Sequence, residues 1–155
     1  TLDPDSTEAE NLLYNKGVLV ADTYAGFEEC FGFTYPRAIT NPDYDSRLRE
    51  ISAGSWDGSY LDEIERSHGH LFEQARNSFE LMFFAPDGEG EEAVQSRCTA
   101  FLAELDTPAI LITHGATLCV LRGLLRSLRF EDTLDLSHEQ GCIYKIENGI
   151  ETILR

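Results

Sequence analysis

The stretch AILITHGATLCVL, residues 109–121, carries the strongest indication of the fold. A run of apolar residues stops at Thr113, which predicts a short buried strand. His114 and Gly115 follow directly, and the apolar residues after them recur with the spacing of a helix. A strand that leads straight into a helix is typical of an α/β fold, in which sites form at the carboxyl ends of strands. His114 is therefore the first candidate for a functional residue.

Helical spacing recurs on both sides of this stretch. Apolar residues predict amphipathic helices over 59–77 and 91–105, and a helix after His114 that ends near Arg129. A serine N-cap and a capping-box-like glutamate predict a further short helix over 6–14. Helices are thus expected throughout the chain.

Further strands complete the pattern. The segment from Val18 begins like a strand and continues like a helix, and SRLREIS at 46–52 predicts a brief strand before glycine-rich turns. The end of the chain predicts a hairpin in which CIYKIE and IETILR flank the turn Asn148-Gly149. Helices and strands alternate through the centre without an internal repeat, which indicates one α/β domain over residues 1–155 with a partly parallel sheet.

Composition and charge restrict the partners of the protein. The 155 residues carry 28 acidic and 12 basic side chains, a formal net charge of −16, which disfavours nucleic acid and anionic membranes as partners. No apolar run is long enough to span a membrane. Four widely spaced cysteines lie among apolar neighbours: Cys30, Cys98, Cys119 and Cys142. We interpret them as small buried side chains of a protein in the reducing cytoplasm.

Three motifs stand in a fixed order along the chain. They are RLREISAGSWDG at 47–58, PDGEGEEAVQSR at 86–97 and ILITHGATLCVLRGLL at 110–125. Together they resemble motifs of the histidine phosphatase superfamily, the phosphoglycerate mutase-like proteins, and the resemblance extends over roughly 17–155. It implies a three-layer sandwich in which helices flank a mostly parallel sheet.

The resemblance also implies a chemistry. A histidine attacks phosphorus and becomes transiently phosphorylated, arginines and a second histidine hold the phosphoryl oxygens, and a carboxylic acid protonates the leaving oxygen. No metal or other cofactor is implied. Matched by motif, Glu50 is the candidate general acid and His114 the second, phosphate-contacting histidine. Gly115, Glu89 and Lys16 are the candidates for substrate contacts, and the implied partner is a small phosphorylated molecule.

The sequence departs from the family pattern near its start. Residues 1–20 contain neither a histidine nor an arginine, so the family's Arg-His-Gly motif with its nucleophile is not found. A second family arginine would fall at Leu19, with only Lys16 nearby. We therefore expect an N-terminally shortened domain whose nucleophile lies on a segment outside this chain. His114 itself as the nucleophile stays an alternative, as does the copy of the motif in Ser67-His68-Gly69-His70, which lies inside a predicted helix.

Several candidate residues have a structural alternative. Glu50 is also interpreted as a surface glutamate paired with Arg47 or Arg49. Glu89 is a rival candidate for the acid, or else it caps the next helix or binds backbone amides. Trp56 is expected in the core, and His138 in a solvated loop. A stripe of three arginines on one helix is expected to pair with acidic residues or to form a positive patch: Arg122, Arg126 and Arg129.

Three functions follow from these alternatives. The first is a phosphomonoesterase that works through a phosphohistidine, if the missing nucleophile segment exists. The second is a pseudophosphatase that binds a phosphorylated ligand or a protein, and the third is an acidic interaction domain without pocket chemistry. The oligomeric state is left open, with a homodimer as one outcome.

Overall fold

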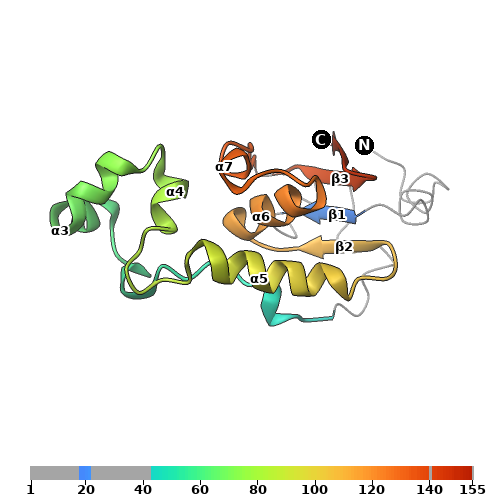
Figure 1. Cartoon of the computed structure of the whole chain (residues 1–155), viewed down its shortest axis with the longest axis horizontal. Helices are drawn as coiled ribbons and strands as arrows, with labels where there is room; N and C mark the ends of the chain where they lie inside the picture. Colours follow the sequence, from blue (N-terminus) through green and yellow to red (C-terminus); the bar gives the residue numbers. More distant parts are fainter. Residues whose placement is uncertain (1–17, 22–42, 140, 155) are drawn as a thin grey trace.

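The computed structural model of the chain describes residues 18–21, 43–139 and 141–154. Figure 1 shows a small sheet with helices packed beside it and a helical extension at the opposite end of the molecule. The predicted helix over 6–14 and the helical continuation after residue 21 lie outside the described residues. The prediction of an α/β fold is confirmed.

The sheet has the strand order β2-β1-β3-β4. Its strands are β1 (Val18–Ala21), β2 (Ala109–Ile112), β3 (Ile143–Glu147) and β4 (Ile150–Leu154). β1 and β2 are parallel, whereas β1–β3 and β3–β4 are antiparallel. Among the described strands the sheet is thus mixed, and the predicted mostly parallel sheet is not confirmed. The reason is the C-terminal hairpin, since strands joined by a two-residue turn must be antiparallel. The three-layer arrangement stays a prediction.

The predicted hairpin itself is confirmed. Asn148 and Gly149 link β3 to β4 with φ values of 52° and 78°. Two successive positive φ values are the geometry of a type I′ turn, for which Asn-Gly is the preferred pair.

The described residues contain five α-helices, and three of them match predicted helical segments. They are α3 (Leu61–Gln74), α4 (Ser78–Met82), α5 (Gly90–Ala103), α6 (Gly115–Leu125) and α7 (Phe130–Thr133). The predictions of helices over 59–77 and 91–105 are confirmed. α6 ends before the expected Arg129, because Ser127 turns into the left-handed region with a φ of 55°. The short helices α4 and α7 were not predicted.

The predicted strand in SRLREIS is wrong. Ser46–Leu48 forms a 3₁₀ helix, η2, whose N-cap Asp45 accepts a 2.8 Å hydrogen bond from the backbone N–H of Arg47. The residues after it, up to Ala53, have no regular secondary structure and join no described strand. A second 3₁₀ helix, η3 (Gly54–Trp56), follows. The apolar residues of this segment, Leu48 and Ile51, pack into the main core and do not pair in the sheet.

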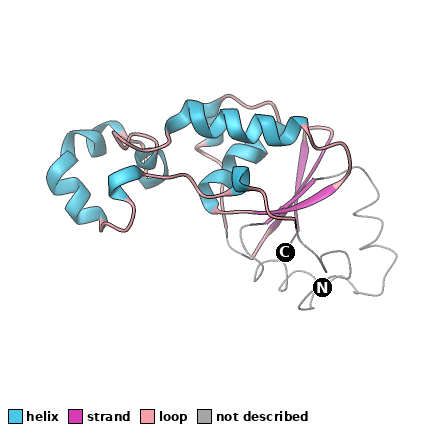
Figure 2. Ribbon diagram, turned by 90° about the horizontal axis from the view of Figure 1, so that it is seen from below, coloured by secondary structure: helices cyan, strands magenta, loops and turns pink. Residues whose placement is uncertain are grey.

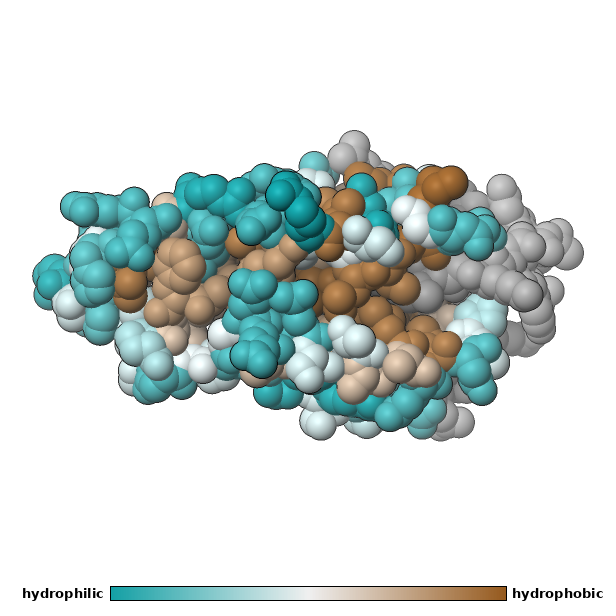
Figure 3. Space-filling view, in the orientation of Figure 1, coloured by the Kyte–Doolittle hydropathy of each residue, from teal (hydrophilic) through white to brown (hydrophobic). Residues whose placement is uncertain are grey.

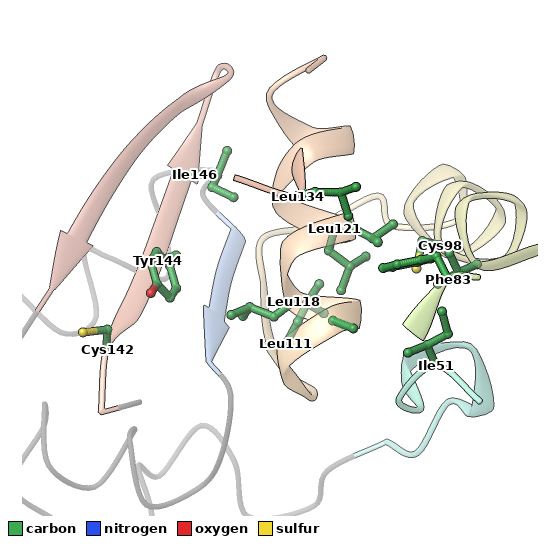
Figure 4. Close-up of a cluster of buried hydrophobic side chains, with 13 residues drawn as sticks. Ile51, Phe83, Cys98, Leu111, Leu118, Leu121, Leu134, Cys142, Tyr144 and Ile146 are labelled. Atoms are coloured by element: carbon green, nitrogen blue, oxygen red, sulfur yellow. The ribbon is translucent and has the colours of Figure 1, made fainter. Parts of the chain in front are cut away.

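The main core lies around α6, which Figure 4 shows between the sheet and α5. Leu118 and Leu121 of α6 are fully buried between Tyr144 of β3 and Cys98 of α5. Burial raises the pKa of the Cys98 and Cys119 thiols to about 11. Three of the cysteines are therefore buried, free side chains, as predicted: Cys98, Cys119 and Cys142. Cys30 lies outside the described residues.

A second, smaller core joins η3 to α3 and α4. Trp56, Ile64 and Leu81 are its largest buried members, which confirms the prediction that Trp56 is a core residue. α3 departs from helical geometry at His68, whose ring contacts the edge of Trp56 with the centroids 5.1 Å apart. Figure 2 shows α3 and α4 extending away from the sheet.

The surface has separate hydrophilic and apolar areas. On the face in Figure 3, hydrophilic residues cover α3 and the exposed side of α5, and apolar residues gather over α6 and β2. No helix in the described part of the chain is long and apolar enough to cross a membrane.

The contact of α6 with α7 requires a glycine. A Cβ at Gly123 would overlap the buried Thr133 side chain, with Thr133 Cγ2 at 2.9 Å and Cβ at 3.0 Å. We expect Gly123→Ala to lower the free energy of unfolding by about 1–3 kcal/mol, because overpacking forces α6 and α7 apart. Urea unfolding measures this change. Gly69→Ala is the control, since a Cβ there meets nothing within 4 Å, and an equal loss in both variants would contradict the packing argument.

Candidate active site

His114 lies between β2 and α6, at the carboxyl end of β2, as the sequence predicted. His114 is the N-cap of α6, with φ −119° and ψ 167°, and its carbonyl accepts a 2.7 Å bond from the N–H of Leu118. Its ring is exposed. Neither this imidazole nor the N–H of Gly115 makes a hydrogen bond with the described residues. Among the described residues, these two donors in the first turn of α6 therefore have no hydrogen-bond partner.

Glu50 occupies the next two amides of the same turn. Its Oε2 accepts a 3.2 Å bond from the N–H of Ala116, and its Oε1 accepts a 3.0 Å bond from the N–H of Thr117. Oε1 also accepts a 2.9 Å bond from the N–H of Ile51. The carboxylate is thus a helix cap supplied from a distant segment, where the helix dipole favours negative charge.

This geometry corrects one interpretation of Glu50. The side chain is half-buried against α6, and it pairs with neither Arg47 nor Arg49. Gly115 lies beside it, because a Cβ at Gly115 would stand 3.9 Å from Glu50 Oε2. Three of the predicted site residues, Glu50, His114 and Gly115, are therefore brought together at one helix terminus.

Glu89 lies in a neighbouring buried ion pair. Its side chain is 7% exposed and accepts bonds from Arg97 Nε at 2.6 Å and Arg97 Nη2 at 3.1 Å. Arg49 Nη2 adds a third bond of 2.8 Å, while about half of the Arg49 side chain stays exposed. Glu89 stands at the N-cap of α5 without a side-chain cap bond, so the prediction that it caps this helix is wrong. The guanidinium groups of Arg97 and Arg49 both bind the Glu89 carboxylate. Substrate contact by Glu89 stays a prediction.

Arg97 connects this ion pair to the Glu50 segment. Its Nη1 donates to the carbonyl of Arg47, and its Nη2 lies 3.3 Å from Thr117 Oγ1. Thr117 Oγ1 in turn donates a 2.7 Å bond to the carbonyl of Arg49. α5, α6 and the segment before Glu50 are thus held by one polar network. Sequence reasoning missed Thr117, because one threonine in an otherwise apolar helix carries no signal of its partners.

None of the other described candidates joins the group formed by Glu50, His114 and Gly115. Lys16 is outside the described residues. His68 and His70 lie on α3, as predicted, and the exposed His138 stacks on Phe79 at 5.6 Å. Among the described residues, no group of three His, Cys, Asp or Glu side chains is placed to hold a metal ion.

The arginine stripe pairs with acidic residues. Arg122 is buried, with Nε 2.8 Å and Nη2 2.9 Å from the Glu151 carboxylate and its guanidinium 3.7 Å from the Tyr144 ring centroid. Arg126 also reaches Glu151, and Arg129 pairs with Asp132. The prediction of pairing is confirmed, although Arg122 lies in the core rather than at the surface.

Comparison with protein families shows to which family the chain belongs. The sequence model of the histidine phosphatase superfamily (branch 1) matches residues 35–151. The chain belongs to the histidine phosphatase superfamily. The matched range includes all three motifs and the residues of the Glu50–α6 contact.

Solved structures agree with the fold. The α-ribazole phosphatase from Shigella flexneri is 20% identical with a TM-score of 0.60, covering 96% of this chain and 79% of that one. A variant of the protein TTHB049 from Thermus thermophilus is 16% identical with a TM-score of 0.60, covering 90% and 98%. A mycobacterial glucosyl-3-phosphoglycerate phosphatase in complex with inorganic phosphate is 22% identical with a TM-score of 0.55, covering 70% and 60%.

These similarities support the fold and nothing finer, because identities this low do not carry an activity across. The chain covers 48%, 60% and 53% of three mycobacterial structures that it matches. No curated protein matches the chain significantly.

Proposed function

We propose that this histidine phosphatase hydrolyses a phosphomonoester of a small molecule through a phosphohistidine intermediate. The nucleophilic histidine is supplied by a segment outside the 155 residues. Its ring nitrogen forms a bond to phosphorus as the ester P–O bond breaks, and water later releases inorganic phosphate. The buried, free cysteines suit the cytoplasm, which is our proposal for its location.

The observation that carries this proposal is the first turn of α6. The His114 ring and the Gly115 N–H lie at a helix N-terminus and have no hydrogen-bond partner among the described residues, an arrangement that suits phosphoryl oxygens. Glu50 caps the adjacent amides, which places a carboxyl group next to the same space.

Glu50 is the proposed proton donor to the leaving oxygen. In its present contacts the carboxyl group accepts hydrogen bonds from three backbone N–H groups. Donation to the leaving oxygen requires the protonated carboxyl group. The proposed cycle needs no metal ion.

A second candidate function is a phosphate-binding module without turnover. The absence of histidine and arginine from residues 1–20 favours it, since the family pattern places its nucleophile there. In that case His114 and the α6 terminus bind a phosphorylated ligand and no covalent step follows.

One pair of measurements separates the two functions. The protein expressed from its complete gene is assayed for hydrolysis of p-nitrophenyl phosphate, and its binding of inorganic phosphate is measured by calorimetry. Turnover is expected, together with an upstream segment that ends in Arg-His-Gly. Phosphate binding without turnover would favour the binding module, and the absence of both would contradict both functions.

A further inference from the structure

We propose that Thr117 is a positioning residue that fixes Glu50 at the N-terminus of α6. The inference rests on the proposed function, because it assigns Glu50 a role in that reaction. Thr117 lies within the third motif without an assigned role, and its side chain is fully buried.

Thr117 contacts the Glu50 segment through two groups. Its backbone N–H donates to Glu50 Oε1 at 3.0 Å, and its hydroxyl donates to the carbonyl of Arg49 at 2.7 Å. The hydroxyl oxygen is also 3.3 Å from Glu50 Oε1, but its single hydrogen goes to the shorter bond. One residue thus holds both the Glu50 carboxylate and the peptide that precedes it.

The hydroxyl is held from its other side as well. Arg97 Nη2 lies 3.3 Å from Thr117 Oγ1, which accepts its hydrogen, and Thr117 is fully buried. This one oxygen therefore accepts a bond from Arg97 and donates one to the Arg49 carbonyl. A buried hydroxyl with a donor and an acceptor in place has a defined orientation.

The Arg49–Glu50 peptide has no regular secondary structure to define its position. Thr113 Oγ1 anchors the preceding carbonyl, that of Leu48, with a 2.7 Å bond. Thr117 anchors the next carbonyl and is thus the last fixed point before Glu50. A carboxyl group that must meet a leaving oxygen needs this accuracy, because a displacement of about 1 Å can cost about 10²-fold in rate.

Thr117→Val tests this role because valine keeps the volume and removes only the hydroxyl. We expect kcat to fall by about 10-fold or more with little change in KM, since the side chain touches no substrate. Thr117→Ser restores the hydroxyl and should recover most of the loss. Thr133→Val is the matched control, because Thr133 is also buried and its hydroxyl bonds the Arg129 carbonyl at 3.1 Å, away from Glu50.

The leaving group distinguishes positioning from stability. A basic leaving oxygen needs a proton from Glu50 more than an acidic one, so Thr117→Val should lose more activity on phenyl phosphate than on p-nitrophenyl phosphate. An equal loss on both substrates, or a loss that Thr133→Val reproduces, would overturn the inference.

An inactive wild-type protein would contradict the proposed function. A second measurement would still test the role of Thr117 in that case. Hydrogen exchange at the amides of Ala116 and Thr117 reports the Glu50 contact directly. We expect faster exchange at these two amides in Thr117→Val than in wild type or Thr133→Val. Unchanged exchange would show that Thr117 does not position Glu50.

Discussion

Arg97→Ala is expected to lower the free energy of unfolding by about 3–5 kcal/mol. Arg97 and Glu89 are 8% and 7% exposed, and two bonds of 2.6 and 3.1 Å join them. Removing the guanidinium leaves a buried carboxylate with Arg49 as its remaining ionic partner, and it frees Thr117 and the Arg47 carbonyl. The loss is large because the buried Glu89 carboxylate keeps only one of its two guanidinium partners, not because the pair itself adds that much stability.

Urea unfolding followed by circular dichroism measures this difference. Arg66→Ala is the matched control, because Arg66 and Asp62 form a 3.2 Å ion pair while 72% and 74% exposed. Such a surface pair contributes about 0–1 kcal/mol. Equal effects of the two substitutions would contradict the role of Arg97 in joining α5 to the Glu50 segment.

The largest expected effect on activity comes from His114→Ala. We expect kcat/KM for p-nitrophenyl phosphate to fall by about 10²–10³-fold, the loss typical of one preorganised donor at a developing negative charge. Stability should change little, since the ring is exposed and makes no hydrogen bond with the described residues. Initial rates at several substrate concentrations measure the change.

His70→Ala is the control for this substitution. His70 is also exposed, but it lies on α3, away from the start of α6. It should keep the wild-type rate. If His114→Ala keeps it too in an active protein, His114 does not contact the phosphoryl group.

The strand, histidine and helix at 109–125 were predictable because their signals are local. Apolar residues repeat with the strand and helix periods on either side of His114, and the structure follows them in β2 and α6. The same holds for the Asn148-Gly149 turn. The three motifs also predicted the family correctly.

The contacts that form the site were not predictable in this way. Glu50 and Ala116 are 66 residues apart, and nothing near either residue indicates that one caps the other. The ladder of a strand and the packing of a 3₁₀ helix give similar short patterns, so Ser46–Leu48 was misassigned. Strand direction depends on which segments pair, and two of the four described strands come from a hairpin that must be antiparallel.

The first turn of α6 is expected to accept a phosphoryl group, whether or not turnover follows. Titration of the isotope-labelled protein with inorganic phosphate, followed by amide chemical shifts, tests it most directly. We predict saturable shifts that are largest at Gly115, with His114 and the two amides now bonded to Glu50 next in size. The absence of saturation, or shifts that lie away from residues 114–117, would contradict the claim.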